Sequence, residues 1–370
     1  MRILSNVQDL GPTNGITVQT LQTTEELCRR GHEVHVAYVE DGPFRGGYEA
    51  AGARTVEVPV LDLHLAGVPT AVGPLVSAVR TGAATHPDVV YSHRMQTLPW
   101  ALATGVRARC PVVTHLHGLT GCTHRTVNAV LGRRSHSLFA VSAFLRDELV
   151  AGGFPSSRVE VVHNGIDPGD YPFGDEGDRS AARLALGIDA DAFVVLTYGR
   201  MDPTKGIEVL LDATDLMRAA GTEVHLLVVG SPTTVDYLKV LRLRLRGAAV
   251  TWLPQRPDVV TPLHASDVVA VPSVWDEPFG RVVVEALSTG RPAVASAVGG
   301  IPEVLTGQFT RFLVPRGDAD ELARRLTELR DWRTDDPGLA AVCRGHVVRN
   351  FTLGAMVDRI EHQLEASTGR

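Results

Sequence analysis

The sequence predicts an α/β protein built from two doubly wound domains, each with a parallel sheet covered by helices. At 370 residues the chain exceeds one ordinary domain and fits two of typical size. Short runs rich in Val, Ile and Leu alternate with helical patterns from end to end, which is typical of a parallel sheet buried on both faces. A segment rich in Pro, Gly, Asp and aromatic residues, 167–178, interrupts this alternation and is the best linker candidate.

The first half of the chain is predicted to form one domain over residues 1–168. Gly31 ends a helical pattern just before an apolar run, which indicates a helix followed by a strand. The strand candidates are residues 2–7, 33–39, 55–58, 88–91, 112–115, 138–141 and 159–162, and the clearest helix candidates are 17–30, 71–84 and 142–151.

The same alternation restarts after the linker and predicts a second domain over residues 169–351. Its strand candidates are residues 193–198, 224–229, 250–252, 268–271 and 293–296, with helix candidates at 206–220, 282–288 and 318–329. The final segment, 352–370, is helical over 352–366, and we expect it to pack back on the first domain.

Composition excludes several classes of protein. A formal net charge of −6 argues against a nucleic-acid partner, which would require a basic stripe. The four cysteines form no Cys-x-x-Cys pair, so reduced thiols are expected. Neither a leader peptide nor an apolar run of transmembrane length is evident. We therefore expect a cytoplasmic protein without stable membrane association, present as a monomer or a homodimer.

A cationic pair follows the first strand of the second domain. Arg200 and Lys205 lie between Gly199 and Gly206, and Lys239 is the only other lysine of the chain. Ligands of open parallel sheets bind beyond the carboxyl ends of the strands, where this segment is expected. An arginine fork and a mobile lysine suit a diphosphate. The alternative is a solvated Arg and Lys at the start of a helix.

A pair of carboxylates marks the second segment of interest. Glu277 precedes Pro278, Phe279 and Gly280, and Glu285 follows eight residues after Glu277. Proline favours a first helical turn, so the free amides at the start of this helix would face a phosphate. Carboxylates accept hydrogen bonds from paired sugar hydroxyls. The alternative is a helix cap with a salt bridge.

Two Asp-x-Asp pairs resemble metal motifs but are interpreted otherwise. Asp189 with Asp191 and Asp318 with Asp320 fall at a turn and at a helix start, where carboxylates favour the helix dipole. We assign no metal to them.

Taken together, the motifs resemble those of the retaining glycosyltransferases of family 4, which have the GT-B fold. They occur in the family's order and span nearly the whole chain: Asn14-Gly15, Gly31-His32-Glu33-Val34, His115-Leu116-His117-Gly118, Asn164-Gly165-Ile166-Asp167, Gly199-Arg200 with Lys205-Gly206, Glu277-Pro278-Phe279-Gly280 with Glu285, and Gly299-Gly300-Ile301-Pro302-Glu303. The resemblance implies two Rossmann-like domains whose parallel sheets face each other across a cleft. The first would bind the acceptor and the second a nucleotide-sugar donor.

The resemblance also implies roles for residues of the second domain. Arg200 and Lys205 would bind the donor diphosphate and stabilise the charge that develops on it. Glu277 would bind hydroxyls of the donor sugar, Glu285 the ribose, and Arg256 would lie beside the nucleobase. Further donor contacts would come from the backbone at Phe279, Gly280, Arg281 and Val282.

In the first domain, Gly15 would let the backbone approach the donor phosphate, although the family often has two adjacent glycines where this chain has Asn14-Gly15. His117, which precedes Gly118, would meet the donor sugar near the reacting centre, and His115 remains an alternative. His117, Glu277, Arg200 and Lys205 are therefore the candidate catalytic residues. No metal or other cofactor is implied.

The activity implied is transfer of a hexosyl or N-acetylhexosaminyl unit, with retention, from a UDP-sugar to a soluble small molecule. A cyclitol, an amino sugar or a natural-product core of secondary metabolism would serve as acceptor, bound by loops 8–14, 62–67 and 92–96. The alternatives are a transferase of lipid or cell-envelope polysaccharide assembly and a nucleotide-sugar 2-epimerase. A non-catalytic sugar-binding protein and a phosphorylase fit the motifs less well.

Overall fold

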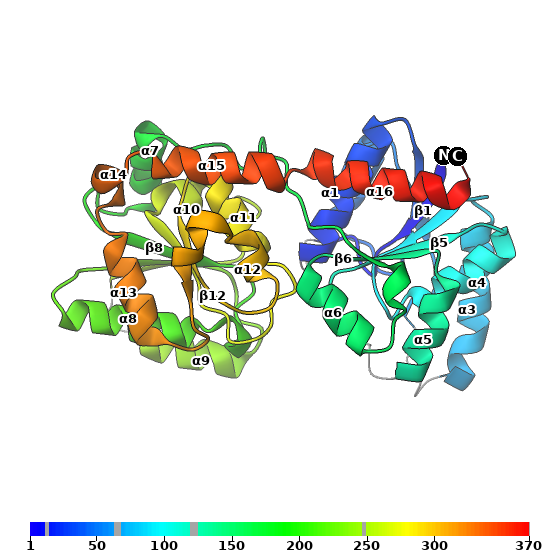
Figure 1. The fold of residues 1–370 in the computed structure, drawn as a ribbon, viewed down its shortest axis with the longest axis horizontal. Coiled ribbons are helices and arrows are strands. Elements are labelled where there is room, and N and C mark those ends of the chain that lie inside the picture. Colours follow the sequence, from blue (N-terminus) through cyan, green and yellow to red (C-terminus); the bar gives the residue numbers. More distant parts are fainter. Residues whose placement is uncertain (12–14, 63–67, 119–124, 246–248, 370) are drawn as a thin grey trace. The chain divides into compact units, whose positions relative to one another are not determined.

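The computed structural model describes residues 1–11, 15–62, 68–118, 125–245 and 249–369. The chain forms two compact units, which are called unit 1 and unit 2 below. Unit 1 comprises Met1–Gly165 with Leu353–Arg370, and unit 2 comprises Ile166–Thr352. In each unit, helices lie on both faces of a parallel sheet (Figure 1). The predicted fold class is therefore confirmed.

Unit 1 contains a seven-stranded sheet of order β3-β2-β1-β4-β5-β6-β7, with every pairing parallel. All seven predicted strands are present, and the central ones, such as β4, β5 and β6, are buried along their whole length. The strands are β1 (Arg2–Asn6), β2 (Glu33–Tyr38), β3 (Arg54–Glu57), β4 (Val89–Ser92), β5 (Val112–Leu116), β6 (Ser137–Ala140) and β7 (Val159–Val161). The helices are α1 (Gly15–Arg29), α2 (Arg45–Ala50), α3 (Val68–Ala83), α4 (Leu98–Ala108), α5 (Arg125–Arg134), α6 (Ala143–Ala151) and α16 (Leu353–Thr368).

The last helix, α16, packs against α1, β4 and β5 of unit 1. Its apolar side chains at helical spacing, Met356, Val357, Ile360 and Leu364, are buried in the core beneath β1 and β2. Each such side chain contributes on the order of 1.5–3 kcal/mol by leaving water. Arg30 adds ion pairs of 2.7 Å and 2.6 Å to Asp358 and Glu361 of α16.

Unit 2 contains a six-stranded parallel sheet of order β10-β9-β8-β11-β12-β13. Its strands are β8 (Val194–Tyr198), β9 (His225–Val229), β10 (Val250–Leu253), β11 (Val268–Val271), β12 (Ala293–Ser296) and β13 (Leu313–Val314). Its helices are α7 (Glu176–Leu186), α8 (Ile207–Ala219), α9 (Val235–Arg244), α10 (Val260–Ala265), α11 (Arg281–Ser288), α12 (Ile301–Val304), α13 (Ala319–Glu328), α14 (Trp332–Asp335) and α15 (Leu339–Asn350). The sequence did not predict β13, because two residues are too few to form a recognisable apolar run.

The two Asp-x-Asp pairs have local structural roles. The Asp318 carboxylate caps α13 by accepting a 2.9 Å hydrogen bond from the amide of Glu321. Asp189 accepts a 2.8 Å hydrogen bond from the amide of Asp191, which closes a turn. Both carboxylates thus satisfy nearby backbone donors, as interpreted from the sequence.

A buried ionic network holds the amino ends of the unit 2 strands. Asp267, which precedes β11, accepts a 2.7 Å bond from Arg183 and a 2.8 Å bond from the amide of Val194. Arg179 and Arg333 contact its other oxygen at 3.2 Å and 3.3 Å. Arg183 is only 1% exposed, and it also donates to backbone carbonyls, including that of Ala265 at 2.9 Å.

No helix in the described ranges is both long and apolar enough to cross a lipid bilayer.

Replacing Arg183 with methionine should lower the free energy of unfolding of unit 2 by about 3–5 kcal/mol, because it leaves Asp267 and several carbonyls short of a buried donor. Urea denaturation followed by tryptophan fluorescence tests this, since Trp252, Trp275 and Trp332 all lie in unit 2.

The matched control is Arg324→Met on α13, which removes a half-exposed arginine paired with Glu321 and Glu328. This change should have little effect on the free energy of unfolding, because ion pairs at the surface contribute little to stability. Equal effects of the two substitutions would contradict the assignment of Arg183 as a structural anchor.

Candidate functional site

Lys205 and Glu277 meet at the carboxyl edge of the unit 2 sheet. Lys205 ends a short 3₁₀ helix (Pro203–Lys205) that follows β8, and Asp202 caps this helix through a 2.9 Å bond from the amide of Thr204. The ammonium of Lys205 lies 2.5 Å from Oε1 of Glu277. Ser273 donates a 2.7 Å hydrogen bond to the same oxygen. The carboxylate is thus oriented by two donors, while the lysine side chain stays 27% exposed.

Close backbone packing brings the segments of this pair together. Gly206 has φ of +65°, and a Cβ there would lie 1.9 Å from the carbonyl oxygen of Pro272. Gly299 has φ of +55°, and its Cβ would lie 2.0 Å from the carbonyl oxygen of Glu277. The amide of Gly300 donates a 2.7 Å bond to that same carbonyl. Only glycine permits both approaches, which explains why these motifs contain it.

Glu285 lies in a second, more buried network. It is 6% exposed, and its carboxylate accepts hydrogen bonds from Tyr171 at 2.9 Å, Tyr198 at 2.6 Å and Arg281 at 2.6 Å. Burial, followed by the charge of Glu285, raises the pKa of Tyr198 well above its usual value, so its hydroxyl remains a donor. A ribose at Glu285 would share the carboxylate with these donors.

Arg200 and Arg256 are placed differently from the residues above. Arg200 follows β8 and pairs with Asp202 at 2.9 Å, with its side chain 57% exposed. Arg256 follows β10 and pairs with Asp258 at 2.9 Å. Both lie beyond the carboxyl ends of strands, as predicted for Arg200, but each is engaged by a neighbouring aspartate.

The start of α11 offers backbone groups at the same edge. Gly280, with φ of +102°, precedes the first helical residue, Arg281. The side chain of Phe279 is 3% exposed and packs edge-to-face on Phe351, so only its backbone can face a ligand. The Arg281 guanidinium folds onto Glu285 and Tyr171, and the carbonyl of Val282 accepts a long hydrogen bond from Tyr198.

The predicted residues of unit 1 lie at the carboxyl edge of its sheet or beside it. His115 in β5 is 1% exposed, whereas His117 just beyond the strand is partly exposed. Their ring centroids are 4.3 Å apart, because residues two positions apart along a strand point to the same face of the sheet. Burial, and then His117, lowers the pKa of both His115 and His93 well below the usual range, so both rings are neutral. Gly15 is the first residue of α1.

Parts of the predicted site lie outside the described residues. This applies to Asn14, to residues 12–14 of the first predicted acceptor loop and to residues 63–67 of the second.

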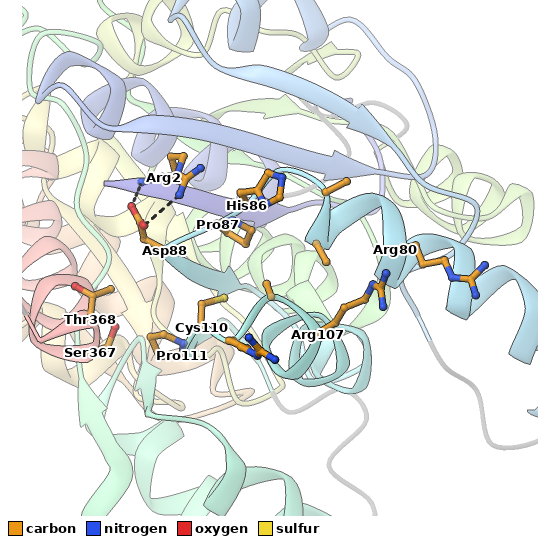
Figure 2. Close-up of a pocket in the computed structure, with 14 residues that line it drawn as sticks. Arg2, Arg80, His86, Pro87, Asp88, Arg107, Cys110, Pro111, Ser367 and Thr368 are labelled. Atoms are coloured by element: carbon orange, nitrogen blue, oxygen red, sulfur yellow. Dashed lines mark hydrogen bonds and ion pairs between the residues drawn. The ribbon is translucent and has the colours of Figure 1, made fainter.

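A hollow of about 810 Å³ opens at the opposite edge of the unit 1 sheet. It is lined by Arg2, Arg80 and Arg107, and Arg2 pairs with Asp88 across 3.7 Å (Figure 2). Arg2 and Asp88 mark the amino ends of β1 and β4. Because ligands of doubly wound sheets bind at the carboxyl ends, we do not assign the transfer site to this hollow.

Sequence reasoning missed several residues of these networks. Tyr198 immediately precedes the predicted Gly199-Arg200 motif. Its position at the end of a strand could have indicated that it lies at the candidate site. Ser273 and Trp275 lie in the loop before Glu277, and Lys205 lies 5.4 Å from the Trp275 ring centroid. Tyr171 comes from the linker, and no sequence pattern connects it to Glu285.

Comparisons with known proteins identify the family. Residues 13–170 match the profile of Glycosyltransferase Family 4, and residues 178–334 match that of Glycosyl transferases group 1. The D-inositol 3-phosphate glycosyltransferase of Mycolicibacterium gilvum is 32% identical over 351 residues, covering 86% of this chain and 78% of the relative. The chain belongs to glycosyltransferase family 4. The enzyme of the same name from Mycobacterium avium is 30% identical over 366 residues, covering 90% of this chain and 84% of the relative.

Solved structures show the same two-domain GT-B architecture. HepE from Anabaena, crystallised with UDP and glucose, matches with a TM-score of 0.85 and 25% identity, over 99% of each chain. Sucrose-phosphate synthase from Thermosynechococcus elongatus, at 21% identity and a TM-score of 0.77 over 99% of this chain and 100% of that one, shares the fold. The predicted family and fold are therefore confirmed, and this family 4 protein is a glycosyltransferase.

In this glycosyltransferase, Gly206→Ala should destabilise unit 2 more than Gly187→Ala. The two glycines have nearly equal φ, +65° and +66°, but a Cβ at Gly187 meets nothing within 4 Å. Gly187→Ala should therefore cost only the left-handed backbone penalty of about 1–2 kcal/mol. Gly206→Ala should add about 1–3 kcal/mol from the clash with Pro272. Urea denaturation measures both, and equal losses would contradict the close packing.

Proposed function

We propose that this protein is a retaining glycosyltransferase that transfers a hexosyl or N-acetylhexosaminyl unit from a UDP-sugar to a hydroxyl of a phosphorylated cyclitol. The observation that carries the proposal is the contact between Lys205 and Glu277 at the carboxyl edge of unit 2. The cation suits the diphosphate of a nucleotide sugar, and the carboxylate beside it suits the hydroxyls of the sugar. The relatives named for D-inositol 3-phosphate support the choice of acceptor, and HepE with UDP supports the choice of donor.

In the proposed donor complex, Lys205 turns its ammonium from Glu277 to the diphosphate. Glu277, still oriented by Ser273, then accepts hydrogen bonds from hydroxyls of the donor sugar. Arg200 swings from Asp202 to the same diphosphate, which its exposed side chain allows. Glu285 and its tyrosines form the ribose side of the site, and amides at the start of α11 add phosphate contacts.

The proposed transfer breaks the bond between the anomeric carbon and the diphosphate oxygen while an acceptor hydroxyl attacks from the same face. The departing phosphate oxygen takes the hydroxyl proton, so the products are the glycoside and UDP. Negative charge grows on the diphosphate in the transition state, where Lys205 and Arg200 stabilise it most. His117 would contact the donor sugar near the anomeric carbon. No step requires a metal or another cofactor, which stays a prediction.

Lys205→Met should lower kcat by about 10²–10³-fold, the usual cost of losing one charge-stabilising donor. Glu277→Ala should lose most transfer as well, because the sugar loses its hydroxyl acceptor. UDP release from a panel of UDP-sugars with D-inositol 3-phosphate measures the rate, and a thermal melt checks the fold.

The control is Lys239→Met, which changes the only other lysine. Its side chain is 72% exposed and pairs with Asp236 on α9, so turnover should stay at the wild-type level. Near-normal turnover of Lys205→Met would count heavily against the assigned site.

Arg94 is the proposed partner of the acceptor phosphate. It follows β4 in the predicted acceptor loop 92–96 and is two-thirds buried beside Asp62, 3.6 Å away. The pairing is longer than a hydrogen bond, so an acceptor phosphate can replace it with shorter, bidentate contacts.

Arg94→Ala should raise KM for D-inositol 3-phosphate by about 10–100-fold, in line with the loss of a charged hydrogen bond of about 1.5–3 kcal/mol. The affinity for UDP should not change. Initial rates with D-inositol 3-phosphate and with unphosphorylated inositol test this. A similar KM change for both acceptors would show that Arg94 does not bind the phosphate.

The two alternative activities, epimerisation and transfer to an envelope acceptor, would each give a different product from the same UDP-sugar. A nucleotide-sugar 2-epimerase would release a rearranged sugar from the UDP-sugar without an acceptor. A transferase of lipid or envelope polysaccharide assembly would turn over only with a lipid-linked or polymeric acceptor. Product analysis of one UDP-sugar panel, with and without the cyclitol phosphate, distinguishes the three.

A further inference from the structure

Three histidines gather at the carboxyl edge of the unit 1 sheet. His93 directly follows β4, His115 lies in β5, and His117 lies just beyond β5. One ring nitrogen of each lies within 4.8 Å of the corresponding atoms of the other two. The sequence singled out His115 and His117 as alternatives for one role, but it did not predict that His93 completes a cluster.

The outer ring nitrogens of two of these histidines are held by hydroxyl groups. Nε2 of His93 lies 2.9 Å from Oγ of Ser5, and Nδ1 of His115 lies 2.8 Å from the hydroxyl of Tyr91. If these nitrogens carry the protons and donate them, the lone pairs lie on Nδ1 of His93 and Nε2 of His115. An outer hydrogen bond of this kind is what orients histidine ligands in metal sites.

The inner nitrogens of the same two residues lack a hydrogen-bond partner within the described part of the chain. His93 and His115 are 3% and 1% exposed, and Nδ1 of His93 and Nε2 of His115 are buried. Leaving such a group unsatisfied costs about 1–3 kcal/mol. Two buried ring nitrogens of the cluster are therefore left without a hydrogen-bond partner.

We propose that His93, His115 and His117 bind one divalent transition-metal ion, with Zn²⁺ as the best match. Imidazole ligands without a carboxylate suit Zn²⁺ and its neighbours in the periodic table, not Mg²⁺ or Ca²⁺. Three protein ligands leave the fourth position of a tetrahedral ion to water or a substrate group. His117 is the most exposed of the three residues.

The ring positions are close to those that the ion needs. Bonds of about 2.0–2.1 Å in a tetrahedral arrangement place imidazole centroids about 5 Å apart and nitrogens about 3.3 Å apart. The observed centroid distances are 4.3 Å between His115 and His117 and 6.0 Å between His93 and His117. These values lie on either side of the required one, and the ring nitrogens lie within 4.8 Å of one another, so binding an ion would draw the rings together.

All three proposed ligands lie in unit 1, and the site shares His117 with the proposed contact to the donor sugar. The competing explanation is a purely structural stack of neutral histidines, because His93 also packs edge-to-face on Tyr91 at 4.5 Å between centroids. That explanation requires no metal affinity, so a direct binding experiment separates the two.

The experiment titrates Co²⁺ into the tag-free, chelator-treated full-length chain and records the visible d–d absorption of low-symmetry Co²⁺. The expected result is one equivalent bound per chain, followed by displacement with Zn²⁺. His93→Ala and His115→Ala should weaken binding at least about 100-fold, and Ser5→Ala, which keeps every ligand, about 10-fold. Circular dichroism checks that each variant is folded.

His136→Ala is the matched control, because it removes an exposed histidine from the same unit. It should bind Co²⁺ as the wild type does. The proposal is overturned if the folded wild type shows no d–d absorption, or if His93→Ala and His115→Ala bind as tightly as His136→Ala. If either ligand variant fails to fold, the wild-type titration and Ser5→Ala decide.

Discussion

The arrangement of unit 2 around its candidate site depends on backbone packing that excludes a Cβ atom. Gly206 lies against the carbonyl of Pro272, and Gly299 lies against that of Glu277. These two contacts hold three loops, which follow β8, β11 and β12, at one edge of the sheet. Lys205 precedes Gly206, and the backbone of Glu277 is what Gly299 packs against. The positions of the two charged residues therefore follow from this close backbone packing. Electrostatic attraction then needs only to orient the side chains.

Burial distinguishes the Asp267 network of unit 2 from the ion pairs of Lys205 and Arg200, although both use the same kinds of residue. At the amino ends of the strands, Asp267 and Arg183 are buried and hydrogen-bonded to each other and to backbone groups. This network stabilises the fold. At the carboxyl ends, Lys205 and Arg200 stay partly exposed and each has one acidic partner. A partly exposed cation with one acidic partner can exchange that partner for a ligand at low cost, whereas an enclosed cation cannot. The enclosed network and the proposed donor site thus lie at opposite edges of the parallel sheet.

In unit 1 the carboxyl edge carries two proposals on neighbouring residues, which depend on different observations. The acceptor phosphate is assigned to Arg94 because of its charge and its loose pairing with Asp62. The metal site is assigned to His93 and its two partners because buried nitrogens converge there. If both are correct, a metal ion and an acceptor would bind at adjacent residues. A metal at His117 would also fix the ring that we propose to meet the donor sugar.

The sequence by itself determined the fold class, the family and most strands, because apolar runs, glycines and motif order are local properties of the chain. It also placed Lys205 and Glu277 at the right edge of the right sheet, since strand ends can be located from the runs. Only the tertiary structure decided which side chains touch: Tyr171 and Tyr198 at Glu285, Ser273 at Glu277, and His93 beside His117. These contacts join residues distant in sequence or depend on side-chain direction, and neither composition nor spacing encodes the distances that decide them.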